Sequence, residues 1–157
     1  MRLKLLFLIL IINGCEDSSP TIQTSDSVEL TVSVSRNATG ELELQAEVSN
    51  NTQQALEHWD NCNYWHGMTV HFVSKDYFEL LLEDPSSRPW CPDTLVSLPP
   101  GGVLGGRSVL SGTLYTWDAE AIEMSADTYY AIVRFEWREV GVSTRHSLTH
   151  GVSFIWP

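Results

Sequence analysis

Apolar and polar residues alternate strictly over two stretches near the start of the chain. The apolar positions are Val28, Leu30, Val32 and Val34 in the first stretch and Leu42, Leu44, Ala46 and Val48 in the second. A period of two places these side chains on one face of a strand, so each stretch predicts a half-buried β-strand. Residues 36–40 between them (Arg-Asn-Ala-Thr-Gly) have turn chemistry, which predicts an antiparallel hairpin.

Further strands are predicted along the rest of the chain, each bounded by turn residues. They lie near residues 68–72, 77–82, 109–117, 129–137 and 152–156. The prolines and glycines of residues 99–102 predict a turn, and the glycine-rich residues 101–106 predict a flexible loop between strands. Only residues 118–124, with Asp118 as an N-cap, indicate one or two turns of helix.

Seven or eight short strands separated by Gly, Pro and Asn turns are typical of an antiparallel, immunoglobulin-like β-sandwich. The alternation also means that each sheet has one face in water. This excludes a doubly wound parallel sheet, whose strands are apolar on both faces. The sequence therefore predicts an all-β fold, with a small closed β-barrel as the alternative.

The first fifteen residues follow a different pattern. Arg2 and Lys4 precede the apolar run of residues 5–12, and the sequence Ile12-Asn13-Gly14-Cys15 follows it. An apolar residue three positions before Cys15 and a glycine directly before it resemble the lipobox of bacterial lipoprotein signal peptides. The resemblance implies that the Cys15 thiol carries diacylglycerol and that the peptide is cut before it. An ordinary secretory signal would need an A-x-A-like site, which is missing, and the run is shorter than the ~20 residues that span a bilayer.

This pattern divides the chain into three parts. Residues 1–14 are the predicted signal peptide, residues 15–25 the lipidated N-terminus with a polar tether, and residues 26–157 the Ig-like domain. The expected location is the bacterial cell envelope, with the protein held on a membrane by lipid. Glu16 replaces the Asp that enteric bacteria read as inner-membrane retention, so the outer membrane is favoured and the inner one stays open.

The charge of the chain excludes two classes of partner. Its net charge is −11, and loss of Arg2 and Lys4 with the signal peptide leaves seven basic and twenty acidic residues, a net charge of −13. Such a surface repels nucleic acid and anionic lipid head groups. The membrane anchor is therefore expected to be the lipid alone.

Cysteine counting agrees with an exported protein. The chain has three cysteines. If Cys15 carries lipid, Cys62 and Cys91 remain as a pair. In an oxidising compartment such a pair is more often a disulfide than two free thiols, so a Cys62–Cys91 disulfide is predicted.

Several turns resemble those of a known family. Val48-Ser49-Asn50-Asn51-Thr52 is similar to the strand exit of many bacterial Ig-like domains. Leu98-Pro99-Pro100-Gly101 and Ala126-Asp127-Thr128-Tyr129-Tyr130 resemble the "L-x-P-G … A-G-T-Y" pattern of the bacterial intracellular proteinase inhibitor family, with Asp127 in place of Gly. The resemblance implies an Ig-like fold and adds proteinase inhibition as an alternative function.

The candidate ligand site lies where aromatic residues interleave with amides and acids. It comprises Trp59, Tyr64, Trp65 and Trp90, which the predicted disulfide would bring together. Ring faces can stack on a glycan or peptide while polar groups fix its orientation. The alternative is that these rings pack around the disulfide and close one end of the sandwich. Trp117, Trp137 and Trp156 lie in predicted strands and are expected in the core.

Catalysis and metal binding have little support in the sequence. The chain has no nucleophile elbow, no H-E-x-x-H motif and no phosphate-binding loop. The five histidines are expected on the surface, since His146 and His150 would lie ~13 Å apart along a strand. We therefore expect no enzyme, no cofactor and no metal, but a lipid-anchored binding or structural accessory domain. A proteinase inhibitor and a glycan or peptide receptor are the alternatives.

Overall fold

The alternation at the start of the chain builds a long hairpin. Its strands are β2 (Val28–Arg36) and β3 (Leu42–Asn50), and their apolar side chains are buried at every second position. The turn between them is closed by Asn37, whose side-chain oxygen accepts hydrogen bonds from the N–H groups of Thr39 and Glu41. This confirms the hairpin predicted from the sequence.

The computed structural model describes residues 21–25, 27–60, 65–87 and 94–157. Cys15, Cys62, Tyr64, Trp90 and Cys91 lie outside these residues, so the predicted lipidation and disulfide stay predictions. No helix among the described residues is long and apolar enough to cross a membrane.

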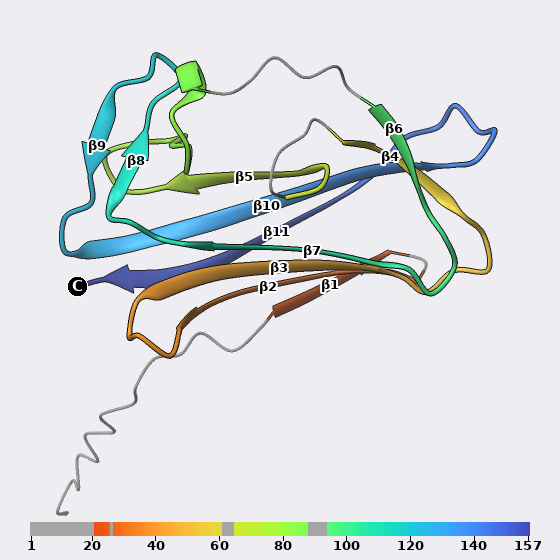
Figure 1. The fold of residues 1–157 in the computed structure, drawn as a ribbon, viewed down its shortest axis with the longest axis horizontal. Coiled ribbons are helices and arrows are strands. Elements are labelled where there is room, and N and C mark those ends of the chain that lie inside the picture. Colours follow the sequence, from red (N-terminus) through yellow and green to blue (C-terminus); the bar gives the residue numbers. More distant parts are fainter. Residues whose placement is uncertain (1–20, 26, 61–64, 88–93) are drawn as a thin grey trace, which may run out of the picture.

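Two antiparallel sheets make up the domain (Figure 1). The first has the order β1-β2-β3-β7, with β1 (Thr21–Ser25) and β7 (Val103–Val109) at its edges. The second is centred on β10 (Asp127–Glu139), which pairs along one side with β11 (His146–Trp156). Its other side pairs with β5 (Met68–Val73) and then with β4 (Leu56–Asp60), beyond which lies β6 (Thr94–Leu98).

Three shorter elements complete the described chain. Strands β8 (Thr113–Tyr115) and β9 (Ala121–Glu123) form a small hairpin, and η1 (Pro85–Ser87) is one turn of 3-10 helix. The hairpin lies beyond the end of β5, at one end of the sandwich (Figure 1).

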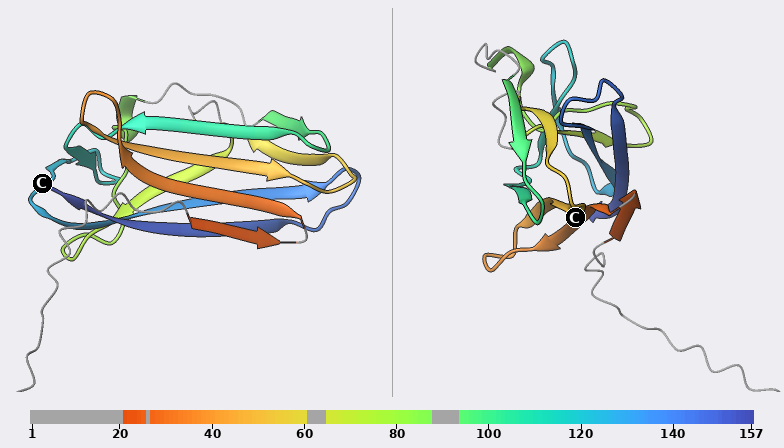
Figure 2. Two further views of the ribbon diagram at one scale, coloured as in Figure 1. Left: turned by 90° about the horizontal axis from the view of Figure 1, so that it is seen from below. Right: turned by 90° about the vertical axis from the view of Figure 1, so that its right-hand side faces the viewer.

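The two sheets pack face to face around one apolar core (Figure 2). Its fully buried side chains include Leu30, Val32, Leu44, Phe72, Val133 and Phe135. The outward positions of the same strands are mostly polar, which is why their sequences alternate. The sheets stay open at β6 and β7, so the fold is a sandwich and not the alternative closed barrel.

The path of the chain is that of an immunoglobulin-like sandwich. It runs through β2 and β3 in one sheet, crosses to β4 and β5, returns as β7 beside β3, and crosses again to β10 and β11. A tyrosine corner marks the start of β10. The Tyr129 hydroxyl accepts a hydrogen bond from Ser125 N–H (3.2 Å) and donates one to Ser125 C=O (3.4 Å). The predicted all-β, Ig-like fold is confirmed.

Asn50 joins two of the turns that carry the resemblances noted in the sequence, the Val48–Thr52 strand exit and the Leu98–Gly101 turn. It is fully buried at the end of β3, and its side-chain amide donates hydrogen bonds to the carbonyls of Gln54, Leu98 and Pro99. Its side-chain oxygen accepts bonds from Thr52. The Val48–Thr52 exit and the Leu98–Gly101 turn are therefore two halves of one structural joint.

Four local predictions were wrong. Residues 103–109 are strand β7 and not part of a loop, and residues 121–123 are strand β9 and not helix. Residues 77–82 form no strand but only isolated bridges at Leu80 and Leu81. Residues 21–25, assigned to the tether, are strand β1, which pairs with β2 from Thr21↔Val32 to Ser25↔Val28.

Candidate ligand-binding site: exposed aromatic loops

Trp65 belongs to the core and not to an open ligand site. Its side chain is only 4% exposed. The indole lies against the backbone of β7, because a Cβ atom placed on Gly106 would be 2.5 Å from Trp65 Cε3. The ring is therefore not accessible for stacking on a ligand, and its predicted binding role is wrong.

Trp59 is half-buried in β4 and already has partners on its ring. The guanidinium carbons of Arg145 and Arg138 lie 4.3 Å and 5.4 Å from the ring centroid. Arg138 Nε also donates to Glu57 Oε2 at 2.9 Å. Two cations thus cover the indole, which leaves little ring surface for a ligand. Of the predicted site, the described residues are this covered ring and the buried Trp65.

Three exposed aromatic side chains lie in two other segments. Phe78 is 84% exposed, Trp117 58% and Tyr77 40%. Residues 74–79 follow β5 and residues 116–120 connect β8 to β9; we call them together the aromatic loops. The two segments adjoin, because Leu81 and Tyr115 exchange main-chain hydrogen bonds of 2.7 and 2.8 Å. The fold therefore gathers three exposed aromatic residues at one end of the sandwich.

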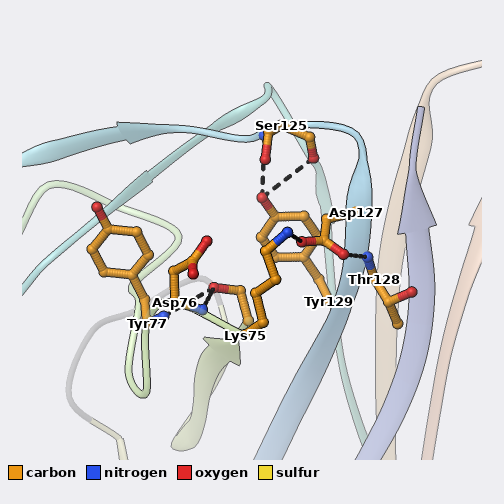
Figure 3. A network of polar contacts seen from close by, with 8 residues as sticks. Lys75, Asp76, Tyr77, Ser125, Asp127, Thr128 and Tyr129 are labelled. Carbon is orange, nitrogen blue, oxygen red and sulfur yellow. Dashed lines mark hydrogen bonds and ion pairs between the residues drawn. The ribbon is translucent and has the colours of Figure 1, made fainter.

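The first aromatic loop is anchored at both the turn and the sheet (Figure 3). The Ser74 hydroxyl oxygen accepts hydrogen bonds from the N–H groups of Asp76 (3.3 Å) and Tyr77 (3.1 Å). Lys75 Nζ lies 2.6 Å from Asp127 Oδ2, and Asp127 Oδ1 accepts the N–H of Thr128. These contacts tie the loop to the first residues of β10.

The Lys75–Asp127 pair also changes the acidity of both groups. The hydrogen bond from Lys75 is the main reason that the pKa of Asp127 lies below its ordinary value. The same bond raises the pKa of Lys75. Both groups therefore stay charged through the neutral range, and the positive charge of Lys75 is matched by a neighbouring carboxylate.

The second aromatic loop is a closed turn that fixes Trp117. Thr116 N–H donates to Glu120 C=O (2.9 Å), and Glu120 N–H donates to the Thr116 hydroxyl (3.2 Å). The indole Nε1–H of Trp117 donates to Glu79 Oε2 at 3.0 Å. The polar edge of the ring is thus bound while most of the side chain stays in water. The prediction that Trp117 lies in the core is therefore wrong. Trp137 is buried as predicted, and Trp156 packs partly against the core.

The segments that carry the exposed rings are rich in acidic residues. Residues 74–83 and 113–123 contain Asp76, Glu79, Glu83, Asp118, Glu120 and Glu123. Their only Lys or Arg is Lys75, which is paired with Asp127. The site therefore combines apolar ring faces with a negative local charge.

One histidine departs from the expected surface position. His58 is fully buried in β4 against Phe135, and neither ring nitrogen has a hydrogen-bond partner among the described residues. Burial lowers the pKa of His58, against an opposing effect of Asp60. Its neighbours do not make a metal site, since no group of three or more metal-ligating side chains occurs in the described part of the chain.

Comparison with known proteins adds little to this geometry. No protein-family model and no curated protein matches the chain. The structure is similar to the crystal structure of the GAE domain of GGA2p from Saccharomyces cerevisiae, with 10% sequence identity and a TM-score of 0.35. The match covers 88% of this chain and 98% of that one.

Proposed function

We propose that this chain is a lipid-anchored protein of the bacterial cell envelope whose Ig-like domain is a non-catalytic binding module. The anchor is supported by the apolar run of residues 5–12 and the Ile12-Asn13-Gly14-Cys15 sequence that follows it. The binding role is supported above all by the exposure of Phe78 and Trp117 on two adjoining loops. These residues lie in loops on a rigid sandwich, where binding residues concentrate.

The physical chemistry of the aromatic loops favours a protein or peptide ligand. Aromatic residues are the commonest hot spots of protein interfaces, because one ring buries a large area with few rotatable bonds. The turn around Ser74 and the Trp117–Glu79 hydrogen bond hold the loops in one conformation. Less conformational entropy is then lost on binding.

The proteinase-inhibitor alternative has less support. The residues that carry the family resemblance have structural partners: Leu98 and Pro99 bond to Asn50, and Tyr129 bonds to Ser125. They build turns and a strand start, and such features belong to the fold and not to an activity.

The anchor is tested by mass spectrometry of the protein purified from membranes. We expect a mature N-terminus at Cys15 with acyl mass attached, and a Cys15→Ala variant that keeps its signal peptide. A mature chain that starts after residue 15 and carries no acyl group would contradict the anchor.

The binding role is tested by photo-crosslinking in living cells. A photoreactive phenylalanine analogue at position 78 is expected to give a discrete adduct with another envelope molecule. The same analogue at Val140, an exposed residue just after the far end of β10, is the control and is expected to give none. Absence of any adduct at position 78, with normal expression, would refute binding by the aromatic loops.

A further inference from the structure

We infer that the aromatic loops bind a cationic protein segment, one that presents Lys or Arg side chains. This inference rests on the proposed binding role and adds the chemistry of the partner. The described structure supports it through the exposed rings, the charges beside them and the charge of the whole molecule.

The exposed rings supply the apolar part of the contact. The Phe78 and Trp117 side chains are 84% and 58% exposed, so their faces are open to a partner. Trp117 also has its indole N–H bound to Glu79, which leaves the carboxylate next to the ring. An ammonium or guanidinium group placed over such a ring interacts with its π-face and with the adjacent carboxylate together.

The charges in the loops select the sign of the partner. Asp118 and Glu120 follow the exposed Trp117 along the chain, and Asp76 precedes Tyr77. The one cation of these segments, Lys75, is paired with Asp127 at 2.6 Å. An acidic or phosphate-bearing segment would therefore meet repulsion at the rim of the rings, whereas a basic segment meets attraction.

The charge of the whole molecule acts in the same direction. A net charge of −11 creates a negative potential around the domain, which accelerates the approach of a basic partner and slows that of an acidic one. The same charges oppose docking of the loops onto anionic lipid head groups. A basic protein segment is thus favoured over a membrane surface as the occupant.

The test uses the full chain, purified in detergent, and a dye-labelled octapeptide of alternating Lys and Ser. Fluorescence anisotropy measures its dissociation constant at low and physiological ionic strength, beside Glu-Ser and Gln-Ser octapeptides. Of the three peptides we expect only the Lys-Ser peptide to bind, with an affinity that falls as salt screens the charges. Trp117→Ala is expected to weaken it by about threefold to tenfold, the range of a cation–π contact.

Charge variants separate a local site from general attraction. Asp118→Asn with Glu120→Gln removes two charges beside Trp117, and Glu43→Gln with Glu47→Gln removes two from the outer face of β3. We expect the first pair to weaken binding severalfold more than the second. Equal losses would show non-specific attraction and overturn the inference.

Two further outcomes decide against the inference. Tighter binding of the Glu-Ser or Gln-Ser peptide would assign the loops to a different ligand class, and binding of the protein's loops to anionic vesicles would assign them to a membrane. If no Lys-Ser peptide binds while the position-78 crosslink persists, the cationic partner is rejected and the binding role stands. If neither the Lys-Ser peptide binding nor the position-78 crosslink is observed, the cationic partner and the binding role are both rejected.

Discussion

Two asparagines with the same local geometry have different environments. Asn37 and Asn50 each precede a threonine by two residues, and in both cases the asparagine side-chain oxygen accepts the Thr N–H at 3.0 Å and the Thr hydroxyl at 2.7 Å. Asn37 lies in an exposed turn, whereas Asn50 is fully buried and donates to three carbonyls. The same residue type therefore stabilises a hairpin in one place and joins two loops in the other.

Replacing the buried asparagine is expected to cost much more stability. Asn50→Ala removes the side-chain donor of the Leu98 carbonyl and the acceptor of the Thr52 N–H, whereas the Pro99 carbonyl keeps the N–H of Gly102. The free energy of unfolding should fall by about 2–4 kcal/mol, since each buried unsatisfied group costs ~1–3 kcal/mol. Asn37→Ala should cost under about 1 kcal/mol, because water replaces its exposed contacts. Urea unfolding of the two variants measures both values, and equal losses would contradict the role assigned to Asn50.

His58 is expected to make stability depend on pH. Burial lowers its pKa in the folded protein, and the carboxylate of Asp60 opposes this effect. Below about pH 6.5 His58 therefore binds a proton in the unfolded chain but resists it in the folded protein. The free energy of unfolding then decreases as the pH is lowered, by up to ~1.4 kcal/mol per pH unit. His58→Leu should remove that part of the slope in urea unfolding between pH 7.5 and 5.5. An unchanged slope in the His58→Leu variant would contradict this origin of the pH dependence.

At the scale of elements, β7 depends on a glycine that local propensity would place in a loop. Gly105 and Gly106 weaken a strand in isolation. In the folded protein Gly106 allows the backbone of β7 to meet the Trp65 indole, where a Cβ would lie at 2.5 Å. Pairing with β3 and this contact together outweigh the low propensity.

The neighbouring glycines provide a matched pair of variants. Gly106→Ala forces the Trp65 ring or the strand to move and should cost about 1–3 kcal/mol, the range for overpacking a core. A Cβ on Gly105 would lie 3.8 Å from the nearest atom, Ala46 O. Gly105→Ala should therefore be neutral or stabilise by about 0.4–1 kcal/mol through the unfolded chain. Thermal unfolding compares them, and a tolerated Gly106→Ala would refute the close contact.

The strands that could be predicted are those whose pattern reflects two different environments. Residues 28–34 and 42–48 alternate because one face meets the core and the other meets water. No such local signal distinguishes β7 or β9, whose pairing partners decide their conformation. The exposure of the rings in the predicted ligand site could not be read from the sequence for a related reason. Exposure of Trp65 or Trp117 depends on which distant segment covers the ring, and the residues that cover Trp59, Arg138 and Arg145, are far from it in the sequence.

At the scale of the whole molecule, the predicted disulfide between Cys62 and Cys91 is expected to stabilise the folded domain. Cys62→Ser should lower the free energy of unfolding by about 2–5 kcal/mol, as is typical for loss of a native disulfide from an exported domain. Denaturant unfolding with and without reductant measures the effect, and the wild type in reductant should match the variant. Two thiols that react in protein unfolded without reductant would show that no bond forms.

The register of β3 has a consequence for how the domain assembles. One side of β3 pairs with its neighbour β2, but the other pairs Ser49 with Val103 and Glu43 with Val109. When the chain emerges with its N-terminus first, during synthesis or translocation, the free edge of β3 is therefore exposed until residue 109 has appeared. Closing so long a loop is slow, and an unpaired strand edge can associate with another chain. The interval before β7 arrives is thus the period in which this strand edge is open to association with another chain.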